Sequence, residues 1–406
     1  MTDQTATPGP TACDEAPGGR DWRVPLCTRC VVPATDESAS FDDAGVCSVC
    51  HQIDYKKTAI DWEARGREFD ALIEEHRGKH DYDCIVPFSG GKDSVFTLWY
   101  LVTQKKMKCL VVSFDHGFYR PRVLQNRRRA LKRLGQDILS FTPNWKLVRK
   151  LMYESLRRRG DFCWHCHTGI FSYPMRVAVR YRVPLLLWGE PASEYSSFYA
   201  YDDAEEVNEE RFNRFVNLGI TAEDMRGMLD DTVSDYVPDE RDFLPFTYPS
   251  KKELRELKCR SVLLGHYIPW DVKKQVAIIK EELGWEGDEV EGVPPAYDYE
   301  KIECYMQGVR DYLKYLKRGV GRTNHLVGID IRNGKLSREE GLALMQQYDG
   351  KRPASLDLFL DYLGISEEDF EEIAREHVVA PNSWSNERQP RGPESWDYPQ
   401  WDRERG

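Results

Sequence analysis

The sequence lacks any run of about 18 apolar residues, the length that a helix needs to cross a bilayer. Its first residues are rich in Thr, Pro, Gly and Asp and contain no apolar segment resembling a secretory signal. We therefore expect no membrane span and a cytoplasmic location. Because a reducing compartment disfavours disulfides, the 11 cysteines then point to metal binding or chemistry.

Positive charge is also in short supply, with 57 Lys and Arg against 68 Asp and Glu and a formal net charge of -11. A protein that binds nucleic acid over its whole surface needs an excess of phosphate-neutralising side chains. Two basic runs, at 127–129 and 157–159, lie in segments with a helical pattern, where a solvated face is the ordinary interpretation. The charge balance disfavours nucleic acid as a partner.

What the sequence does contain, without any internal repeat, is a globular chain of 406 residues, 41% of them hydrophobic. Its central part alternates short apolar runs with helical patterns such as 94–103 and 123–134. That alternation predicts an α/β fold with a parallel sheet covered on both faces. The predicted strands are 84–88, 109–114, 137–141, 184–188 and 261–264.

Changes in composition divide the chain into several parts. A stretch at 191–250 is acidic, aromatic and longer than a crossover requires, so we expect an insertion lying over the site. A capping box at 337–340 predicts a helix to Tyr348, and a further helix is expected at about 367–377. The predicted parts are a disordered N-terminus (1–24), a cysteine-rich segment (25–57), an α/β domain (58–270), a helical region (271–378) and a disordered tail (379–406).

The first predicted strand leads into the loop Ser89-Gly90-Gly91-Lys92-Asp93-Ser94. Adjacent glycines let the backbone turn its N–H groups toward an anion, and the following helix adds its positive end. The loop is not a Walker A motif, because Asp follows Lys, and a Gly-x-Gly-x-x-Gly fingerprint is absent. An ordinary strand-to-helix turn needs one Gly rather than this whole string.

The charge of the loop suggests its ligand. A carboxylate at position 93 would repel a bare phosphate, so we expect Asp93 to hold Mg²⁺ beside pyrophosphate. The hydroxyls of Ser89 and Ser94 add hydrogen-bond donors. We assign catalytic roles to Lys92, Asp93 and Ser94.

The loop resembles the signature of the PP-loop ATP pyrophosphatase superfamily, Ser-Gly-Gly-x-Asp-Ser after the first strand. Members cleave ATP between the α- and β-phosphates, adenylate an oxygen and let a nitrogen or sulfur nucleophile displace AMP. The resemblance implies a parallel-sheet PP-loop (HUP-like) nucleotide domain. It implies pyrophosphate binding by Ser89, Gly90, Gly91, Asp93 and Ser94, and an adenosine pocket beside Asp115 (within 114–117), Gly189 and Glu190.

Two Cys-x-x-Cys pairs precede this domain, Cys27 with Cys30 and Cys47 with Cys50, separated by 16 residues. Such knuckles supply four thiolates for a tetrahedral Zn²⁺ ion. A site with four protein ligands has no open position for water, so its expected role is structural. It would hold a segment too small to fold by burial alone, and unrelated free thiols are the alternative.

A third Cys-x-x-Cys pair, Cys163 and Cys166, lies beside two histidines within 163–167. It could bind a metal, form a redox disulfide or pack beneath the insertion. Cys259 or Cys304 could approach it in three dimensions, which would make a three-cysteine iron–sulfur site.

The order of zinc knuckles, PP-loop and helical region resembles the N-acetyl sugar amidotransferase family over about residues 25–376. The resemblance rests on a combination of segments, namely 27–33, 41–50, 184–190, 194–195, 316–322, 330–334 and 337–340. It implies conversion of the N-acetyl group of a nucleotide-linked sugar into an acetamidino group for surface polysaccharide. ATP, Mg²⁺ and Zn²⁺ would be the cofactors, and a separate glutaminase subunit would supply the ammonia.

Two other functions remain open at this point. The same adenylation could thiolate tRNA or a small metabolite, with Cys163 and Cys166 carrying sulfide or an iron–sulfur cluster. The chain could also be a non-catalytic zinc-ribbon adaptor that keeps the PP-loop only as a fold, which any ATP turnover would exclude.

Overall fold

The computed structural model describes residues 22–189, 191–194, 196, 200–201, 207–210, 217, 219–229 and 236–386. Most of the two predicted disordered ends therefore lies outside the described residues. The described parts of these ends are more ordered than we expected. Trp22 and Val24 are buried against the C-terminal helices, and Asn382 donates a hydrogen bond to the Leu316 carbonyl at 3.0 Å. Tertiary burial of apolar side chains outweighs the polar composition at these positions.

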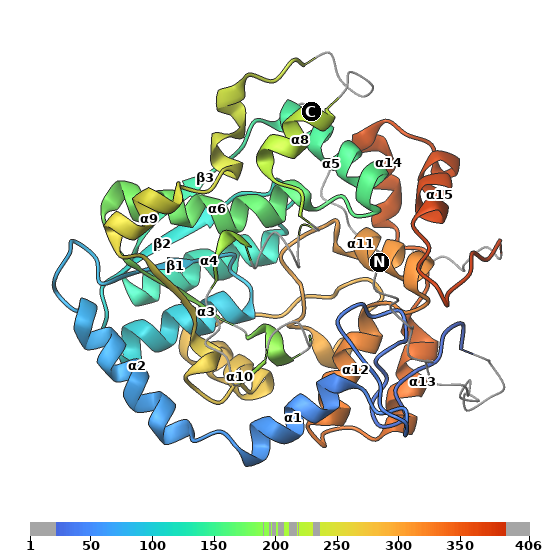
Figure 1. Ribbon diagram of the computed structural model, residues 1–406, viewed down its shortest axis with the longest axis horizontal. Helices are drawn as coiled ribbons and strands as arrows, with labels where there is room; N and C mark the ends of the chain where they lie inside the picture. Colours follow the sequence, from blue (N-terminus) through green and yellow to red (C-terminus); the bar gives the residue numbers. More distant parts are fainter. Residues whose placement is uncertain are drawn as a thin grey trace, which may run out of the picture.

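A five-stranded parallel sheet forms the centre of the molecule (Figure 1). Its strand order is β3-β2-β1-β4-β5, so the chain leaves β1 toward one edge and later returns to its other side. In open parallel sheets this reversal creates a crevice at the carboxyl ends of the strands. All five predicted strands are confirmed within a residue or so: β1 (Cys84–Pro87), β2 (Cys109–Phe114), β3 (Asp137–Phe141), β4 (Leu185–Trp188) and β5 (Arg260–Leu263).

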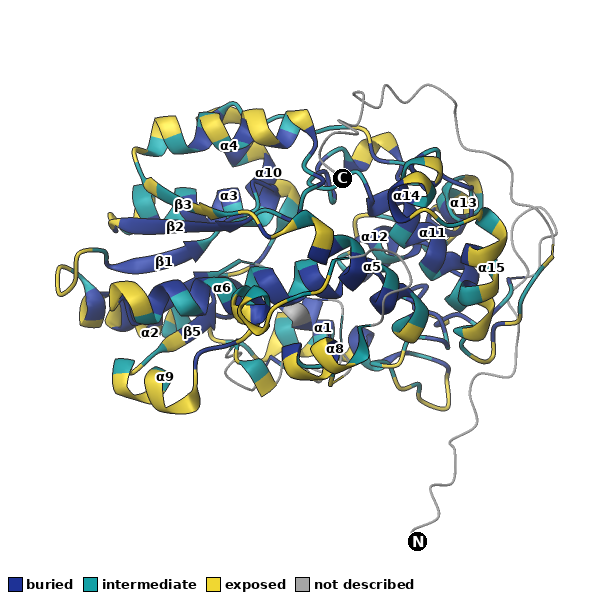
Figure 2. Ribbon diagram, turned by 90° about the horizontal axis from the view of Figure 1, so that it is seen from above, coloured by how far each residue is buried: buried dark blue, intermediate teal, exposed yellow. Residues whose placement is uncertain are grey.

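Helices cover both faces of the sheet because its side chains alternate in direction. Cys84 and Val86 of β1 face the cluster formed with α2, α3, α4 and α10, whereas Ile85 faces α6 and α9. Figure 2 shows β1 and β2 buried between α4 and α9. The helices that belong to this part are α1 (Ser48–Thr58), α2 (Trp62–His76), α3 (Lys92–Trp99), α4 (Pro121–Leu134), α5 (Trp145–Arg159), α6 (Trp164–Tyr181), α8 (Ala222–Met228), α9 (Lys251–Leu257) and α10 (Val272–Leu283).

Short helical turns accompany these elements. A π-helix, η1 (Tyr100–Gln104), extends α3, so the predicted helix at 94–103 is present in two parts. The described part of the insertion contains the 3-10 helices η2 (Ala192–Glu194) and η3 (Glu240–Phe246) as well as α8. Met225 of α8 and Phe246 of η3 pack against Trp164 of α6. Two more 3-10 turns are η4 (Leu264–His266) and η5 (Pro295–Tyr297).

The C-terminal region is helical, as predicted. The capping box is present at Ser337, whose hydroxyl accepts the N–H of Glu340 at 3.2 Å. Apolar side chains of α11, α14 and α15 form one cluster with α5, which joins this region to the sheet domain. Figure 1 shows α5 beside α14. The helices are α11 (Gln307–Arg318), α12 (Arg322–Arg332), α13 (Arg338–Tyr348), α14 (Ser355–Leu363) and α15 (Glu367–Glu376).

No helix in the described part of the chain combines the length and the apolar character that a membrane crossing requires.

Candidate active site and metal centre

The PP-loop lies directly between β1 and α3, at the carboxyl end of the sheet. The hydroxyl oxygen of Ser94 accepts the N–H groups of Ser89 at 3.3 Å and Gly90 at 3.1 Å. The Ser89 hydroxyl in turn accepts the N–H of Gly91 at 3.2 Å. These local bonds fold the loop tightly at the N-terminus of α3, where a helix attracts anions.

Neighbouring side chains pack closely against both loop glycines. Gly90 has φ +91°, and a side chain there would meet the Arg127 Cγ at 2.3 Å. A Cβ on Gly91 would lie 1.7 Å from the Glu303 Oε1. Arg127 belongs to a helix face that is expected to be solvated, but it packs beside the loop with its guanidinium 4.6 Å from the centre of the Tyr119 ring. Arg127 and Glu303 are thus two site residues that the sequence pattern did not indicate.

A cavity of about 340 Å³ opens at the PP-loop. Its wall combines the loop, the carboxyl ends of β1, β2 and β4, the start of α6 and the segment before α11. Of the predicted site residues, the structure brings Ser89, Asp93, Ser94, Gly189, Cys163 and Cys166 to this cavity. Phe114 and His116 of the predicted 114–117 segment, His167 of the third cysteine motif and Cys304 also line the cavity. Lining residues that were not predicted include Tyr119, Phe171, Trp188, Lys301, Glu303 and Arg310.

Some predicted residues lie elsewhere. The side chain of Asp115 does not line the cavity; its Oδ1 accepts the N–H of Gly117 at 2.9 Å and so shapes the turn after β2. The neighbouring His116 faces the cavity instead, and burial together with Arg127 lowers its pKa to about 3. Glu190 lies outside the described residues. No described residue of the insertion lines this cavity, and its position over the site stays a prediction.

Lys92 points away from the cavity into a buried ion-pair network. Its Nζ lies 2.8 Å from Asp93 Oδ2 and 3.1 Å from Glu300 Oε2, and Arg322 approaches the other Glu300 oxygen at 3.6 Å. Burial opposes ionisation of Glu300, but Lys92, Lys301 and Arg322 hold its pKa well below the usual range. In the observed geometry Lys92 therefore ties the PP-loop to the C-terminal region, and its catalytic role stays a prediction.

Asp93 offers an oxygen for a cation. Its Oδ2 pairs with Lys92, whereas its Oδ1 is buried without a hydrogen-bond partner among the described residues. A buried carboxylate oxygen normally has a partner, and carboxylate oxygens are the protein ligands that Mg²⁺ prefers. Asp93 thus fits the predicted Mg²⁺ site, where the ion would neutralise phosphate charge.

Three cysteines line the cavity, namely Cys163, Cys166 and Cys304. Burial raises the pKa of the Cys304 thiol to about 12 and also raises the pKa values of the Cys163 and Cys166 thiols. Cys259 packs instead against the apolar cluster between the sheet and α6. Of the two cysteines that could join the third pair, Cys304 lines the same cavity and Cys259 does not.

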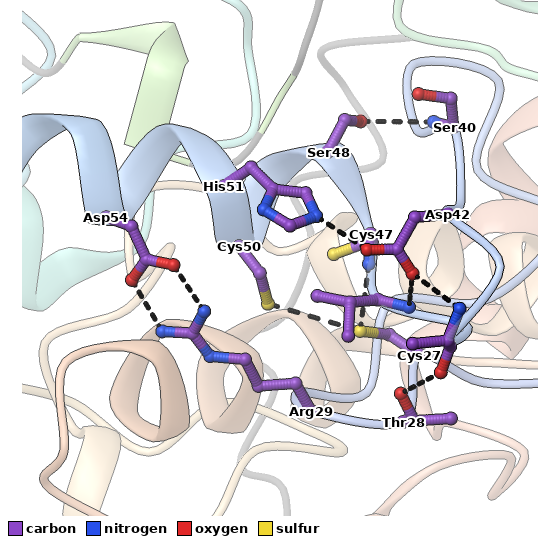
Figure 3. A network of polar contacts seen from close by, with 12 residues as sticks. Cys27, Thr28, Arg29, Ser40, Asp42, Cys47, Ser48, Cys50, His51 and Asp54 are labelled. Atoms are coloured by element: carbon purple, nitrogen blue, oxygen red, sulfur yellow. Dashed lines mark hydrogen bonds and ion pairs between the residues drawn. The ribbon is translucent and has the colours of Figure 1, made fainter.

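The N-terminal cysteines form a separate and more compact group. The sulfurs of Cys27, Cys30, Cys47 and Cys50 are buried and all lie within 4.8 Å of one another. Figure 3 shows three of them, Cys27, Cys47 and Cys50. Arg338 of α13 donates to the Cys30 carbonyl at 3.1 Å, which fixes this segment against the C-terminal helices. Four converging thiols fit the predicted Zn²⁺ ion. An ion held by all four would have no open coordination position for water or substrate. The predicted convergence of these cysteines is confirmed.

Comparison with known proteins adds three kinds of likeness. Residues 296–399 match the family model described as LPS biosynthesis protein WbpG-like, C-terminal domain. An uncharacterized protein of Methanocaldococcus jannaschii is 24% identical over 155 residues, which are 37% of this chain and 53% of that protein. The chain thus spans about half the length of this curated relative.

Two solved structures have partial similarity. NMN synthetase from Francisella tularensis has 11% identity and a TM-score of 0.26, covering 49% of this chain and 92% of that one. U34-tRNA thiolase NcsA from Methanococcus maripaludis, with its 4Fe-4S cluster, has 12% identity and a TM-score of 0.26, covering 89% and 99%.

The parallel sheet, the loop after β1 and the family match together support an ATP pyrophosphatase-type enzyme with the PP-loop fold. The match to the WbpG-like model is confined to residues 296–399, and it makes this part of the C-terminal region similar to LPS biosynthesis proteins.

Proposed function

We propose that the protein adenylates the N-acetyl amide oxygen of a nucleotide-linked sugar and replaces that oxygen with ammonia. The product would be an acetamidino sugar for surface polysaccharide. One observation carries the proposal: the WbpG-like segment does not form a separate lobe but supplies Lys301, Glu303, Cys304 and Arg310 to the PP-loop cavity. A segment typical of LPS biosynthesis therefore meets the loop typical of ATP pyrophosphatases.

The chemistry needs ATP because an amide oxygen is a poor leaving group. In the first step the amide oxygen attacks the α-phosphorus, the bond from this phosphorus to the bridging oxygen breaks, and pyrophosphate leaves. Loss of the amide N–H proton gives a neutral O-adenylyl imidate. In the second step ammonia attacks the imidate carbon, the carbon–oxygen bond breaks, and AMP leaves with the former amide oxygen.

The described residues suggest how the chain would support these steps. The hydroxyls of Ser89 and Ser94 and the start of α3 would bind the departing pyrophosphate, with Asp93 on its cation. Phe171 and Trp188 stack at 4.6 Å between ring centres and line the cavity, which gives a flat apolar wall for a base. We further propose that a separate glutaminase subunit supplies the ammonia.

Sulfur transfer is the second candidate function, and the cavity cysteines favour it. Cys163, Cys166 and Cys304 line the same PP-loop cavity, and three thiols are a donor set that can hold an iron–sulfur cluster. In this case sulfide would take the place of ammonia at the adenylated carbon, with tRNA or a small metabolite as the acceptor.

A direct assay separates the two candidates. The full-length protein, purified without oxygen, is incubated with ATP, Mg²⁺ and a panel of nucleotide-linked N-acetyl sugars, with either ammonium or sulfide. We expect AMP and pyrophosphate, and a product whose mass corresponds to replacement of oxygen by an NH group. We expect zinc without iron in the purified protein. Iron with sulfide in the protein, together with a product formed only from sulfide, would contradict amidotransfer.

A further inference from the structure

The segment at 300–305, here called the strap, lies just before α11 and lines the cavity at the PP-loop. Its backbone is fixed to the turn after β2. The N–H of Arg120 donates to the Glu303 carbonyl at 3.3 Å, and the N–H of Tyr305 donates to the Phe118 carbonyl at 2.9 Å. Between them, Tyr119 and Cys304 pair as an antiparallel bridge. The strap is therefore part of the wall of the nucleotide site.

The strap places a second carboxylate at the PP-loop. The Ser89 hydroxyl lies 3.4 Å from the Glu303 Oε1, and this same oxygen is 1.7 Å from where a Cβ on Gly91 would be. Glu303 and Asp93 line the same cavity. The carboxylate thus lies over the two residues at which pyrophosphate is expected.

Electrostatics decide what a carboxylate can do at this position. Next to a phosphate it is repelled, unless a cation lies between the two groups. The nearest loop cation, Lys92, is already shared between Asp93 and Glu300. Asp93 also has the buried Oδ1 that lacks a partner among the described residues. Mg²⁺ typically takes one or two carboxylates together with substrate phosphates, and these two side chains supply that set.

We propose that Glu303 is a second carboxylate ligand of the divalent cation that accompanies ATP. The inference rests on the proposed ATP pyrophosphatase site, but not on the identity of the sugar or of the nucleophile. It makes the WbpG-like segment a part of the nucleotide site, because the strap delivers this carboxylate. A different role would be a plug, in which the carboxylate occupies the phosphate position and leaves when ATP binds.

The test measures binding rather than turnover, with Mn²⁺ as a spectroscopic substitute for Mg²⁺. Free Mn²⁺ is followed by electron paramagnetic resonance during titration of the full-length protein with and without ATP. We expect Glu303→Gln to weaken Mn²⁺ binding in the presence of ATP by about tenfold or more, a typical cost of disturbing a metal site. Glu303→Asp should recover part of the loss. Glu372→Gln, a change at an exposed position of α15, should behave as wild type.

The possible outcomes remain distinct. If Glu303→Gln binds Mn²⁺ with ATP as tightly as wild type, the proposal is wrong. Unchanged Mn²⁺ binding together with tighter ATP binding by this variant would identify the plug. Wild-type protein that binds no ATP at all would contradict the proposed function itself. Matching circular dichroism spectra and melting temperatures of Glu303→Gln and Glu372→Gln would show that both variants fold.

Discussion

Two groups of cysteines in this molecule differ in how they are assembled. The four thiols of the metal centre come from one short segment and lie within 4.8 Å of one another, closed to other ligands. The three cavity cysteines come from the N-terminal end of α6 and from the strap, far apart in the sequence, and line the cavity beside the PP-loop. Local spacing alone specifies the first group, whereas the second exists only in the folded chain.

This difference predicts opposite consequences of mutation. Changes at the metal centre should reduce stability and should affect catalysis only through this loss of stability. The reason is that all four thiols bind the ion and none is available for a reaction. Changes at the cavity should reduce turnover and leave the fold intact. The ion pairs between Lys92 and Glu300 lie between these two extremes, because they connect the loop to the C-terminal region.

The largest effect is expected from Asp93→Ala. Removing the carboxylate that faces the cation should lower AMP and pyrophosphate release by roughly 100-fold or more, as for other groups that stabilise developing charge. The melting temperature should also fall, because the buried Lys92 Nζ loses its pair with Asp93 Oδ2 and keeps only Glu300. Turnover near that of wild type would remove the loop from the mechanism.

The double change Cys27→Ser and Cys30→Ser should mainly reduce stability. We expect the free energy of unfolding to fall by more than about 4 kcal/mol, as is typical when a structural metal is lost. Zinc content, measured by atomic absorption, should fall with it. Full zinc content in this variant would show that these thiols are not the ligands.

Glu300→Gln should affect both properties. Breaking this buried pair leaves Lys92 with less compensation, at a cost of about 3 kcal/mol. Because the pKa of Glu300 in the folded protein lies below its unfolded value, the pair stabilises the protein above about pH 4.3 and this contribution is lost as the pH falls further. Denaturant unfolding at neutral and acidic pH should therefore show a difference between wild type and variant that shrinks in acid. A difference independent of pH would contradict the ion pair.

The smallest effect is expected from the double change Cys163→Ser and Cys166→Ser. If the product forms from ammonia, these thiols only shape the cavity, and the variant should keep partial activity with ammonium. A cluster ligand cannot be replaced by a hydroxyl, because a hydroxyl does not bind iron as a thiolate does. An inactive variant that is fully folded would favour sulfur transfer.

Much of the sheet domain could be predicted from the sequence. Buried parallel strands are continuous apolar runs, so the segments before Gly90, Asp115 and Gly189 were recognised with nearly the correct bounds. The PP-loop and the Cys-x-x-Cys pairs are also local patterns. These features depend on residues that are close in the sequence, and for this reason the strand, the loop, the helix and the converging thiols could be predicted.

The rest of the site depends on contacts between distant segments. Glu303 lies in an irregular stretch without periodicity, and only the pairing of the strap with the turn after β2 brings it to the loop. Arg127 belongs to a basic helix face, where a solvated position is the ordinary expectation. The sequence around Glu303 shows only a charged residue in a segment without a pattern. This signal does not predict that its side chain lies at the PP-loop.

Isotope labelling of the acetyl group tests the central claim most directly. A nucleotide-linked N-acetyl sugar that carries a heavy oxygen isotope in its acetyl carbonyl is incubated with the protein, ATP, Mg²⁺ and ammonium, and the AMP is analysed by mass spectrometry. If the amide oxygen is adenylated and then displaced, the heavy oxygen must appear in AMP in the same amount as the acetamidino product. Unlabelled AMP accompanied by an acetamidino product would contradict adenylation of the sugar amide.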